Sequence, residues 1–299
     1  MSIIIPGDYH IKDMLEQRQV HCITTQQAEH QDIRPLRIGI LNIMPKAEAY
    51  EYSILFPLGR SIIQIEPVWL RLHSHNYRSS SQTHLDNLYV TFDEAIRHRG
   101  FDGIVVTGAP VEELDYHQVS YWPELQEILT HARKHIVSTL GICWGGLALA
   151  KFIGIEKTAY KKKLFGVFSL KNLQRGHRVT GELDDMFWCP QSRHSGITDS
   201  DMEDASRDGA VNLLAYSEQG GYTIFESADE RFMMHLGHPE YRAGRLIEEY
   251  QRDVQLGRKN IDPPANIDLE RPVNTWRSNA LEFFQQWVKH VYLDTPYEI

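Results

Sequence analysis

The first half of the chain alternates between short apolar runs and longer segments in which apolar residues recur with a helical period. The runs that predict strands cover 36–45, 62–74, 101–110 and 135–142, and the segments that predict helices cover 47–59, 91–100, 122–135 and 144–153. Thr91 and Glu94 have the spacing of a capping box, and Gly100 ends that helical pattern. Apolar strands that alternate with helices indicate an α/β fold with a mostly parallel sheet covered on both faces.

The second half of the chain has a different rhythm. From about 160 to 240, Gly, Ser and Asp turns separate strand-like segments, namely GVFSL, RVTGEL, VNLLAYSEQGGYTIFES and RFMMHLGHP. SEQGGYT is typical of a hairpin connection, and helices are predicted at 241–256 and 277–292. Residues 1–35 are predicted to form an irregular N-terminal extension with a short helix around IKDMLEQRQ. No linker interrupts the remainder, so 36–299 is predicted to be a single domain.

Composition narrows the class of protein. The 299 residues carry a formal net charge of −9 without a long basic run, which argues against nucleic-acid binding. The short run KTAYKKK at 157–163 is typical of a solvated surface segment. Cys22, Cys143 and Cys189 form no disulfide framework, which suits a reducing compartment. The first residues resemble neither a signal peptide nor a membrane span, so we expect a cytoplasmic protein without a membrane partner.

The segment STLGICWGGLALA places Cys143 between Gly141 and Gly145. This G-x-C-x-G arrangement resembles a nucleophile elbow, in which glycines let a strand turn sharply into a helix. The helix dipole would favour a thiolate, and the free N–H groups at the helix start would bind an oxyanion. A lone cysteine is more often a buried structural residue. Here strand, turn and helix occur together, which favours a nucleophile.

The segment GHPEY at 237–241 offers the other groups that a thiol nucleophile needs. His238 is a candidate base, and Glu240 is a candidate for the carboxylate that orients it. Residues two apart in an extended segment point to the same side, so the two side chains are predicted to meet. The alternative is a surface histidine at a strand end. The TGAP loop at 107–110 is either a plain turn or part of a ligand site, since ligands bind where parallel strands end.

Together these motifs resemble the homoserine O-succinyltransferase/O-acetyltransferase family of bacterial methionine biosynthesis. The resemblance runs along nearly the whole chain and includes QDIRPLRIGILNIMPK, HLDNLYVTFDEA, FDGIVVTGAPVEELDYHQVSYWPEL, STLGICWG, KKLFGVF, PQSRH, LGHPEY, YQRDVQLG and WRS. It implies a class I glutamine-amidotransferase-like fold, which is a flavodoxin-like, mostly parallel sheet with decorating hairpins and terminal extensions. It also implies a homodimer.

The resemblance implies a ping-pong reaction in which Cys143 is acylated by an acyl-CoA thioester. His238 would be the general base, and Glu240 would orient it. The residues whose backbone would surround the oxyanion are Trp144, Gly108 and Ala109. The positions that bind substrate in the family fall on Lys163, Ser192 and Arg252, of which Arg252 suits an amino-acid carboxylate.

The residue two positions after the TGAP proline tracks the acyl donor in this family: Gly goes with succinyl-CoA and Glu with acetyl-CoA. Here that residue is Glu112. A succinyl carboxylate beside Glu112 in a desolvated pocket would cost roughly several kcal/mol by like-charge repulsion. We therefore expect acetyl-CoA as co-substrate and no permanently bound cofactor. We also expect no metal, because His131 and His135 lack the glutamate of an HExxH motif.

The acceptor pocket departs from the homoserine branch of the family. The departures are Tyr50 for Thr, Gly146-Leu147-Ala148 for Ala-Gln-Ala, Leu170 for His, Gln191 for His, and Asn279-Ala280 for His-Gly. A pocket that hydrogen-bonds its substrate discriminates strongly, so these changes indicate a changed acceptor. Tyr50, Leu147 and Gln191 are the candidate pocket residues. L-serine is slightly favoured over L-homoserine, and the product would be an O-acetyl amino acid for cysteine or methionine biosynthesis.

Three alternatives remain open. The first is a homoserine O-acetyltransferase of methionine biosynthesis. The second is a glutamine amidotransferase-type hydrolase, which would share the elbow and the His–Glu pair but release ammonia from glutamine. The third is a sensor without activity, against which the intact Cys143, His238 and Glu240 argue.

Overall fold

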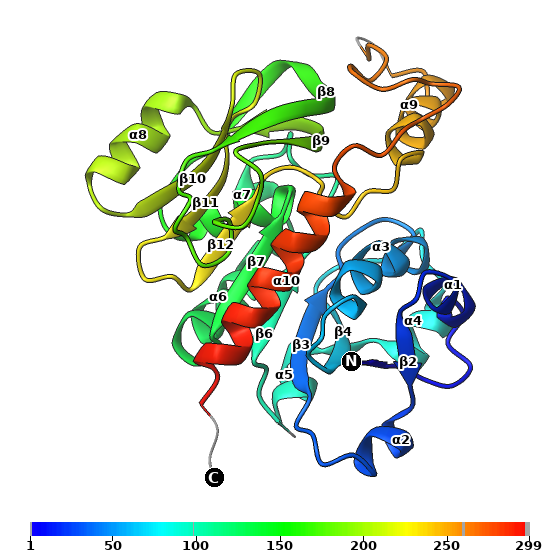
Figure 1. Cartoon of the computed structure of the whole chain (residues 1–299). Coiled ribbons are helices and arrows are strands. Elements are labelled where there is room, and N and C mark those ends of the chain that lie inside the picture. Colours follow the sequence, from blue (N-terminus) through cyan, green and yellow to red (C-terminus); the bar gives the residue numbers. More distant parts are fainter. Residues whose placement is uncertain (1, 98, 259–260, 297–299) are drawn as a thin grey trace.

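The computed structural model describes residues 2–97, 99–258 and 261–296, and Figure 1 shows the chain built around one large sheet. Its strands are β1 (Ser2–Ile4), β2 (His21–Ile23), β3 (Leu36–Leu41), β4 (Ile65–Arg71), β5 (Val90–Thr91), β6 (Gly103–Val106), β7 (Ser138–Ile142), β8 (Thr158–Asn172), β9 (Met186–Gly196), β10 (Val211–Ser217), β11 (Gly221–Ser227) and β12 (Phe232–His235). The strand order is β2-β1-β4-β3-β6-β7-β12-β11-β10-β8-β9, and β5 pairs with β4.

The sheet has a parallel part and an antiparallel part. The strands from β2 to β12 in this order pair in parallel, with Val106 opposite Gly141 and Ile142 opposite His235. From β12 onward the pairs β12–β11, β11–β10, β10–β8 and β8–β9 are antiparallel. The predicted α/β fold with decorating hairpins is thus confirmed, including the hairpin at SEQGGYT, which joins β10 to β11.

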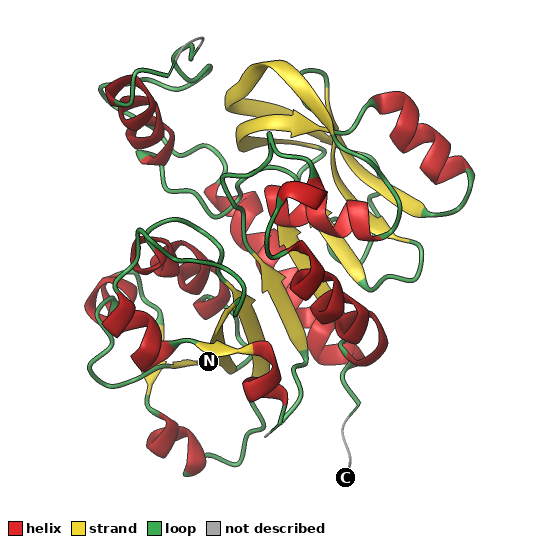
Figure 2. Ribbon diagram, turned by 180° about the vertical axis from the view of Figure 1, so that it is seen from behind, coloured by secondary structure: helices red, strands yellow, loops and turns green. Residues whose placement is uncertain are grey.

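Helices cover both faces of the sheet. They are α1 (Lys12–Gln17), α2 (Thr25–Glu29), α3 (Ala47–Gly59), α4 (Gln82–Leu88), α5 (Phe92–Ile96), α6 (Trp122–His135), α7 (Trp144–Phe152), α8 (Asp199–Arg207), α9 (Arg245–Gln255) and α10 (Arg277–Asp294), with a 3-10 turn at Tyr116–Gln118. The apolar residues of α3 and α10 belong to one hydrophobic cluster, and those of α5, α6 and α7 belong to another. Seen from both sides, the strands pass between these two layers (Figures 1 and 2). No helix in the described part of the chain combines the length and apolarity that crossing a membrane requires.

Two segments differ from the sequence prediction. The first 35 residues are not irregular, because β1 and β2 extend the parallel sheet beyond β4. RVTGEL at 178–183 forms turns rather than a strand. The Asn172 side chain donates to the carbonyl oxygens of Thr180 and Leu183, and Gly181 N–H donates to His177 O, which closes the turns. The division into an extension and one domain stays a prediction.

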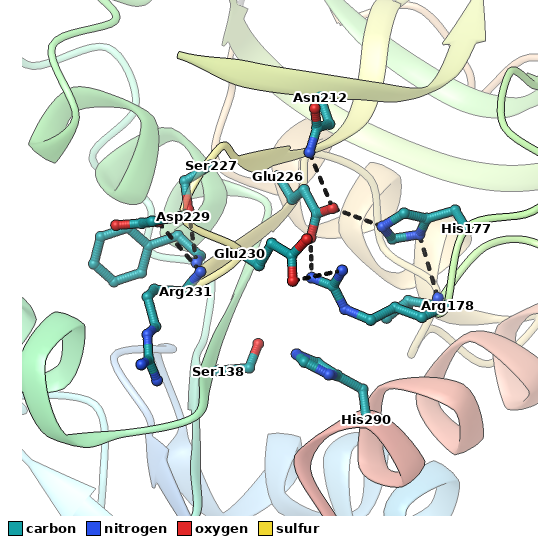
Figure 3. Close-up of polar contacts among 12 residues, drawn as sticks. Ser138, His177, Arg178, Asn212, Glu226, Ser227, Asp229, Glu230, Arg231 and His290 are labelled. Atoms are coloured by element: carbon teal, nitrogen blue, oxygen red, sulfur yellow. Dashed lines mark hydrogen bonds and ion pairs between the residues drawn. The ribbon is translucent and has the colours of Figure 1, made fainter. Parts of the chain in front are cut away.

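These turns lie against a buried polar cluster around Glu226 of β11 (Figure 3). Glu226 Oε1 lies 2.6 Å from His177 Nε2, and Glu226 Oε2 accepts from Arg178 Nη2 at 2.7 Å. Arg178 Nη1 also pairs with Glu230 at 3.0 Å. The cluster therefore holds the turn segment on the antiparallel part of the sheet.

Candidate active site

Cys143 stands on a strained turn between β7 and α7. Its φ of 52° and ψ of −114° are unusual for a residue with a side chain, and strain of this kind recurs at functional sites. A Cβ on Gly141 would lie 2.6 Å from Gly145 backbone atoms, and a Cβ on Gly145 would lie 2.2 Å from Val106 O. The flanking glycines thus allow β7, α7 and β6 to approach closely. The strain itself falls on Cys143.

His238 and Glu240 lie at the same edge of the sheet because β12 runs parallel to β7. His238 Nδ1 is 2.7 Å from Glu240 Oε1, and both side chains are buried. The predicted contact is therefore present, but the predicted extended backbone is not. Residues 239–240 form a turn, in which Tyr241 N–H donates to His238 O at 3.2 Å.

Electrostatic interactions couple the protonation of the His238 imidazole to Cys143. Burial alone would lower the pKa of His238, but the charges of Cys143 and Glu240, and hydrogen bonds to both, raise this pKa well above its usual range. An imidazole that holds its proton next to a cysteine favours a thiolate–imidazolium pair. The arrangement can therefore present a charged nucleophile in a nearly water-free site.

The space beside the thiol is bordered by backbone. Trp144 is the first residue of α7, so its N–H has no partner within the helix. A Cβ on Gly108 would lie 3.5 Å from Cys143 Cβ and 3.8 Å from His238 Cε1, so the glycine keeps this volume open. Thr107 anchors the loop, since its hydroxyl accepts from Ile43 N–H and donates to Gly108 O. Ala109 follows in the same loop and is buried.

Two tyrosines contact the His–Glu pair, and the sequence motifs predicted neither contact. Tyr50 of α3 donates its hydroxyl to Glu240 Oε1 at 2.7 Å. The ring of Tyr241 stacks on the His238 imidazole, with centroids 4.0 Å apart and planes 17° apart. Tyr241 has a sequence signal, because it is the last residue of GHPEY. The contact of Tyr50, 190 residues from Glu240, has none.

Ser192 joins the same network through Glu249 of α9. Ser192 Oγ donates to Glu249 Oε2 at 2.6 Å, and the Tyr241 hydroxyl donates to Glu249 Oε1 at 2.7 Å. Although burial raises it, the charges of Lys163 and His238 hold the pKa of Glu249 below its ordinary value. A buried anion therefore lies close to His238. No sequence motif pointed to Glu249, although it shares a helical face with Asp253 four residues later.

Lys163 and Arg252 both reach the buried carboxylate of Asp253. Lys163 Nζ lies 3.1 Å from Asp253 Oδ2, while Arg252 Nε and Nη2 donate to Oδ1 at 3.0 and 2.8 Å. Although burial raises it, these two cations hold the pKa of Asp253 below its usual range. The bidentate edge of Arg252 is thus occupied by a carboxylate of the protein, and the guanidinium is about half exposed.

The other predicted residues divide into two groups. Desolvation raises the pKa of the half-buried Glu112, and the charges of His194 and Lys163 oppose that rise, so Glu112 and Lys163 lie near each other. Gln191 is buried against the turn before His238, where a Cβ on Gly237 would lie 2.6 Å from its Nε2. Leu147, in contrast, packs among apolar side chains, in the hydrophobic cluster that also holds Trp144 and Ala109. Its role in the acceptor pocket stays a prediction.

A cysteine elbow at the end of a parallel strand, with a His–Glu pair at the end of the next, defines a protein of the class I glutamine-amidotransferase-like fold. A glutamine amidotransferase from Thermotoga maritima superposes with a TM-score of 0.58 at 15% identity, covering 86% of this chain and 99% of that one. At this identity the likeness shows the fold alone.

The sequence comparisons are more specific. The family described as Homoserine O-succinyltransferase matches residues 2–297, and the chain belongs to this family. Two relatives named Homoserine O-acetyltransferase are 39% identical, from Bacillus licheniformis, and 41% identical, from Petrotoga mobilis. Both alignments cover 100% of this chain, with 99% and 97% of the respective relatives. The predicted resemblance and the class of enzyme, an acyltransferase, are thus confirmed. These names favour the homoserine alternative over the serine preference.

Proposed function

We propose that the protein is a homoserine O-acetyltransferase that carries the acetyl group as a thioester on Cys143. The observation that carries this proposal is the buried Cys143–His238–Glu240 arrangement, in which His238 holds its proton beside the thiol. The names of the full-length relatives support the substrate pair. Acetyl-CoA would be the co-substrate, and the O-acetylhomoserine formed would enter methionine biosynthesis.

The reaction would proceed in two transfers. The Cys143 thiolate attacks the thioester carbonyl of acetyl-CoA, and the oxyanion is stabilised by N–H groups at Trp144 and the Gly108 loop. Collapse of this intermediate expels the CoA thiolate, which takes the proton from His238. The neutral His238 then accepts the proton of the homoserine hydroxyl, whose oxygen attacks the acetyl-cysteine. Release of the product restores the Cys143 thiolate and the protonated His238.

The acetyl donor is supported by the surroundings of Glu112. Its carboxyl is desolvated enough to raise its pKa, and a second carboxylate from a succinyl group would add like charge there. We expect Glu112→Gly to raise the rate of Cys143 acylation by succinyl-CoA, relative to acetyl-CoA, by about tenfold or more. Glu113→Gly is the matched control, because Glu113 is the exposed neighbour. An unchanged donor ratio in Glu112→Gly would contradict the assignment.

The decisive experiment follows the acyl group on the protein. Intact-mass spectrometry after mixing with acetyl-CoA should detect an acetyl adduct in the wild type and none in Cys143→Ala. Added homoserine should discharge the adduct faster than the same concentration of serine. Serine discharge at an equal or higher rate would restore the serine preference. Absence of any adduct, together with ammonia release from glutamine, would instead favour the hydrolase alternative.

Two finer expectations belong to the same proposal. A homodimer and a cytoplasmic location are expected of a small-molecule acyltransferase of this family. Light scattering of the purified chain tests the first, because a monomer at micromolar concentration would contradict it. Fractionation of cells that express the chain tests the second.

A further inference from the structure

Tyr50 contacts the carboxylate of the His–Glu pair instead of an open pocket. Its side chain is buried on α3, and its hydroxyl donates to Glu240 Oε1 at 2.7 Å. The same oxygen lies 2.7 Å from His238 Nδ1, while Glu240 Oε2 is buried without a partner among the described residues. Glu240 Oε1 therefore lies within hydrogen-bonding distance of both the His238 imidazole and the Tyr50 phenol.

The start of α3 is fixed in a way that keeps this phenol in place. Ala47 N–H donates to Ser80 Oγ at 2.9 Å, and Ala47 O accepts from Asn42 Nδ2 at 3.3 Å. One residue after Tyr50, the buried Glu51 accepts from the Tyr89 hydroxyl at 2.8 Å. Hydrogen bonds thus hold the turn of helix around Tyr50, and its hydroxyl is preorganised toward Glu240.

We propose that Tyr50 is a positioning residue of the catalytic unit, which fixes Glu240 and sets how tightly His238 holds its proton. In this role Tyr50 acts on the base and does not select the acceptor, in contrast to the pocket role predicted from the sequence. The chemical consequence for acyl transfer rests on the proposed function. The contact itself, and the proton affinity of His238, do not.

The direction of the effect follows from the hydrogen bond. A phenol that donates to a carboxylate stabilises its charge and weakens its attraction for a neighbouring proton. No lysine or arginine of the described residues forms an ion pair with Glu240, so Tyr50 is the neutral donor that stabilises its charge directly. Without the hydroxyl, Glu240 is more negative beside His238, and His238 keeps its proton to higher pH. A smaller fraction of His238 is then unprotonated at neutral pH and able to accept the proton of the acceptor hydroxyl.

The test compares Tyr50→Phe with Tyr52→Phe. In the first variant a phenylalanine ring would fill the same space without the hydroxyl, whereas Tyr52 lies on the same helix, stacks on Phe56 and does not hydrogen-bond Glu240. The readout is the pH titration of the His238 imidazole followed by NMR, with its signal assigned as the histidine signal that is absent in His238→Ala. We expect the midpoint to move up by about one pH unit in Tyr50→Phe, because a hydrogen bond to a charged group is worth about that much. We expect no movement in Tyr52→Phe.

A second measurement separates base tuning from acceptor choice. In Tyr50→Phe, the ratio of the rates with homoserine and serine should stay within about twofold of the wild-type ratio, while both rates at neutral pH fall about tenfold. An unchanged midpoint of the His238 titration, a downward shift, or equal shifts in both variants would overturn the proposal. So would a changed acceptor ratio with an unchanged midpoint. Tyr50→Thr, whose side chain is too short to reach Glu240, should show the same upward shift if Tyr50→Phe does not fold.

Because the His238 titration needs neither acyl-CoA nor an acceptor, its outcome does not depend on the proposed function. A chain that shows the upward shift but forms no acetyl adduct would refute the proposed function and support the role of Tyr50. A chain that forms the adduct but shows no shift would do the reverse.

Discussion

Two histidine–glutamate pairs with buried side chains occur among the described residues, with nearly the same geometry and different surroundings. His238 and Glu240 are 2.7 Å apart, and His177 and Glu226 are 2.6 Å apart. At Glu226 a permanent cation is present, because Arg178 donates to the same carboxylate. At Glu240 the second donor is the neutral hydroxyl of Tyr50. The positive charge beside Glu240 must therefore come from the imidazole itself.

The two histidines, His177 and His238, also differ in what their second ring nitrogen contacts. His177 Nδ1 accepts the N–H groups of Val179 and Thr180, which fixes this imidazole in a neutral tautomer. His238 instead faces Cys143, whose charge raises its pKa. On the proposed function, a buried His–Glu pair serves proton transfer when its free nitrogen meets an ionisable group. It serves as a structural pair when backbone donors occupy that nitrogen.

The largest expected effect is on enzymatic activity, which should depend on the carboxylate of Glu240 and not on that of Glu226. Glu240→Gln keeps the shape of the side chain but removes the charge that stabilises the imidazolium. We expect kcat/KM for acyl transfer to fall by about 10³–10⁴, as when the carboxylate of a catalytic triad is neutralised. Glu226→Gln should leave kcat/KM within about threefold, since this carboxylate contacts no reacting group. Steady-state kinetics of both variants checks the pair, and comparable losses would contradict the contrast.

The second-largest expected effect is on stability, and here the substitution at Glu226 is the one that matters. Glu226→Gln leaves Arg178 without its buried counter-charge, which should lower the free energy of unfolding by about 2 kcal/mol. The value is below that of a fully buried ion pair, because the Arg178 side chain is 28% exposed. Urea denaturation followed by circular dichroism measures it. A loss below about 0.5 kcal/mol would show that the Glu226 cluster does not hold the turns at 178–183.

Much of the fold followed from periodicity. Helices at 47–59 and 122–135 were predicted with the bounds that the structure has. The second has a one-sided apolar pattern that ends at a new strand, whereas the first is apolar around most of its surface and ends at a glycine. RVTGEL was predicted wrongly as a strand, since Val179 and Leu183 are buried by turns that side-chain hydrogen bonds close. The strands β1 and β2 have three residues each, too few to carry a pattern.

Local motifs pointed to those members of the candidate site that are neighbours in sequence, and to none of the contacts between distant residues. Cys143 stands between glycines, and His238 and Glu240 share one segment, so local motifs pointed to them. Tyr50 reaches Glu240 across 190 residues, and the contact of Ser192 with Glu249 spans 57. Such contacts depend on how helices α3 and α9 pack against the sheet, which no local pattern encodes.

The smallest expected effect concerns the open volume beside Gly108. This volume distinguishes the surroundings of the His238–Glu240 pair from those of the His177–Glu226 pair. A methyl group at position 108 would meet Met44 Sδ at 3.4 Å and Cys143 Cβ at 3.5 Å, which are ordinary contacts, so Gly108→Ala should fold. The methyl group would nevertheless occupy the space in which the thioester oxygen must approach backbone N–H groups. We expect kcat to fall about tenfold with an unchanged melting temperature. Gly176→Ala, beside His177, is the control, because a Cβ there meets nothing within 4 Å. Equal kcat values for the two variants would mean that the volume beside Gly108 is not used by the reacting group.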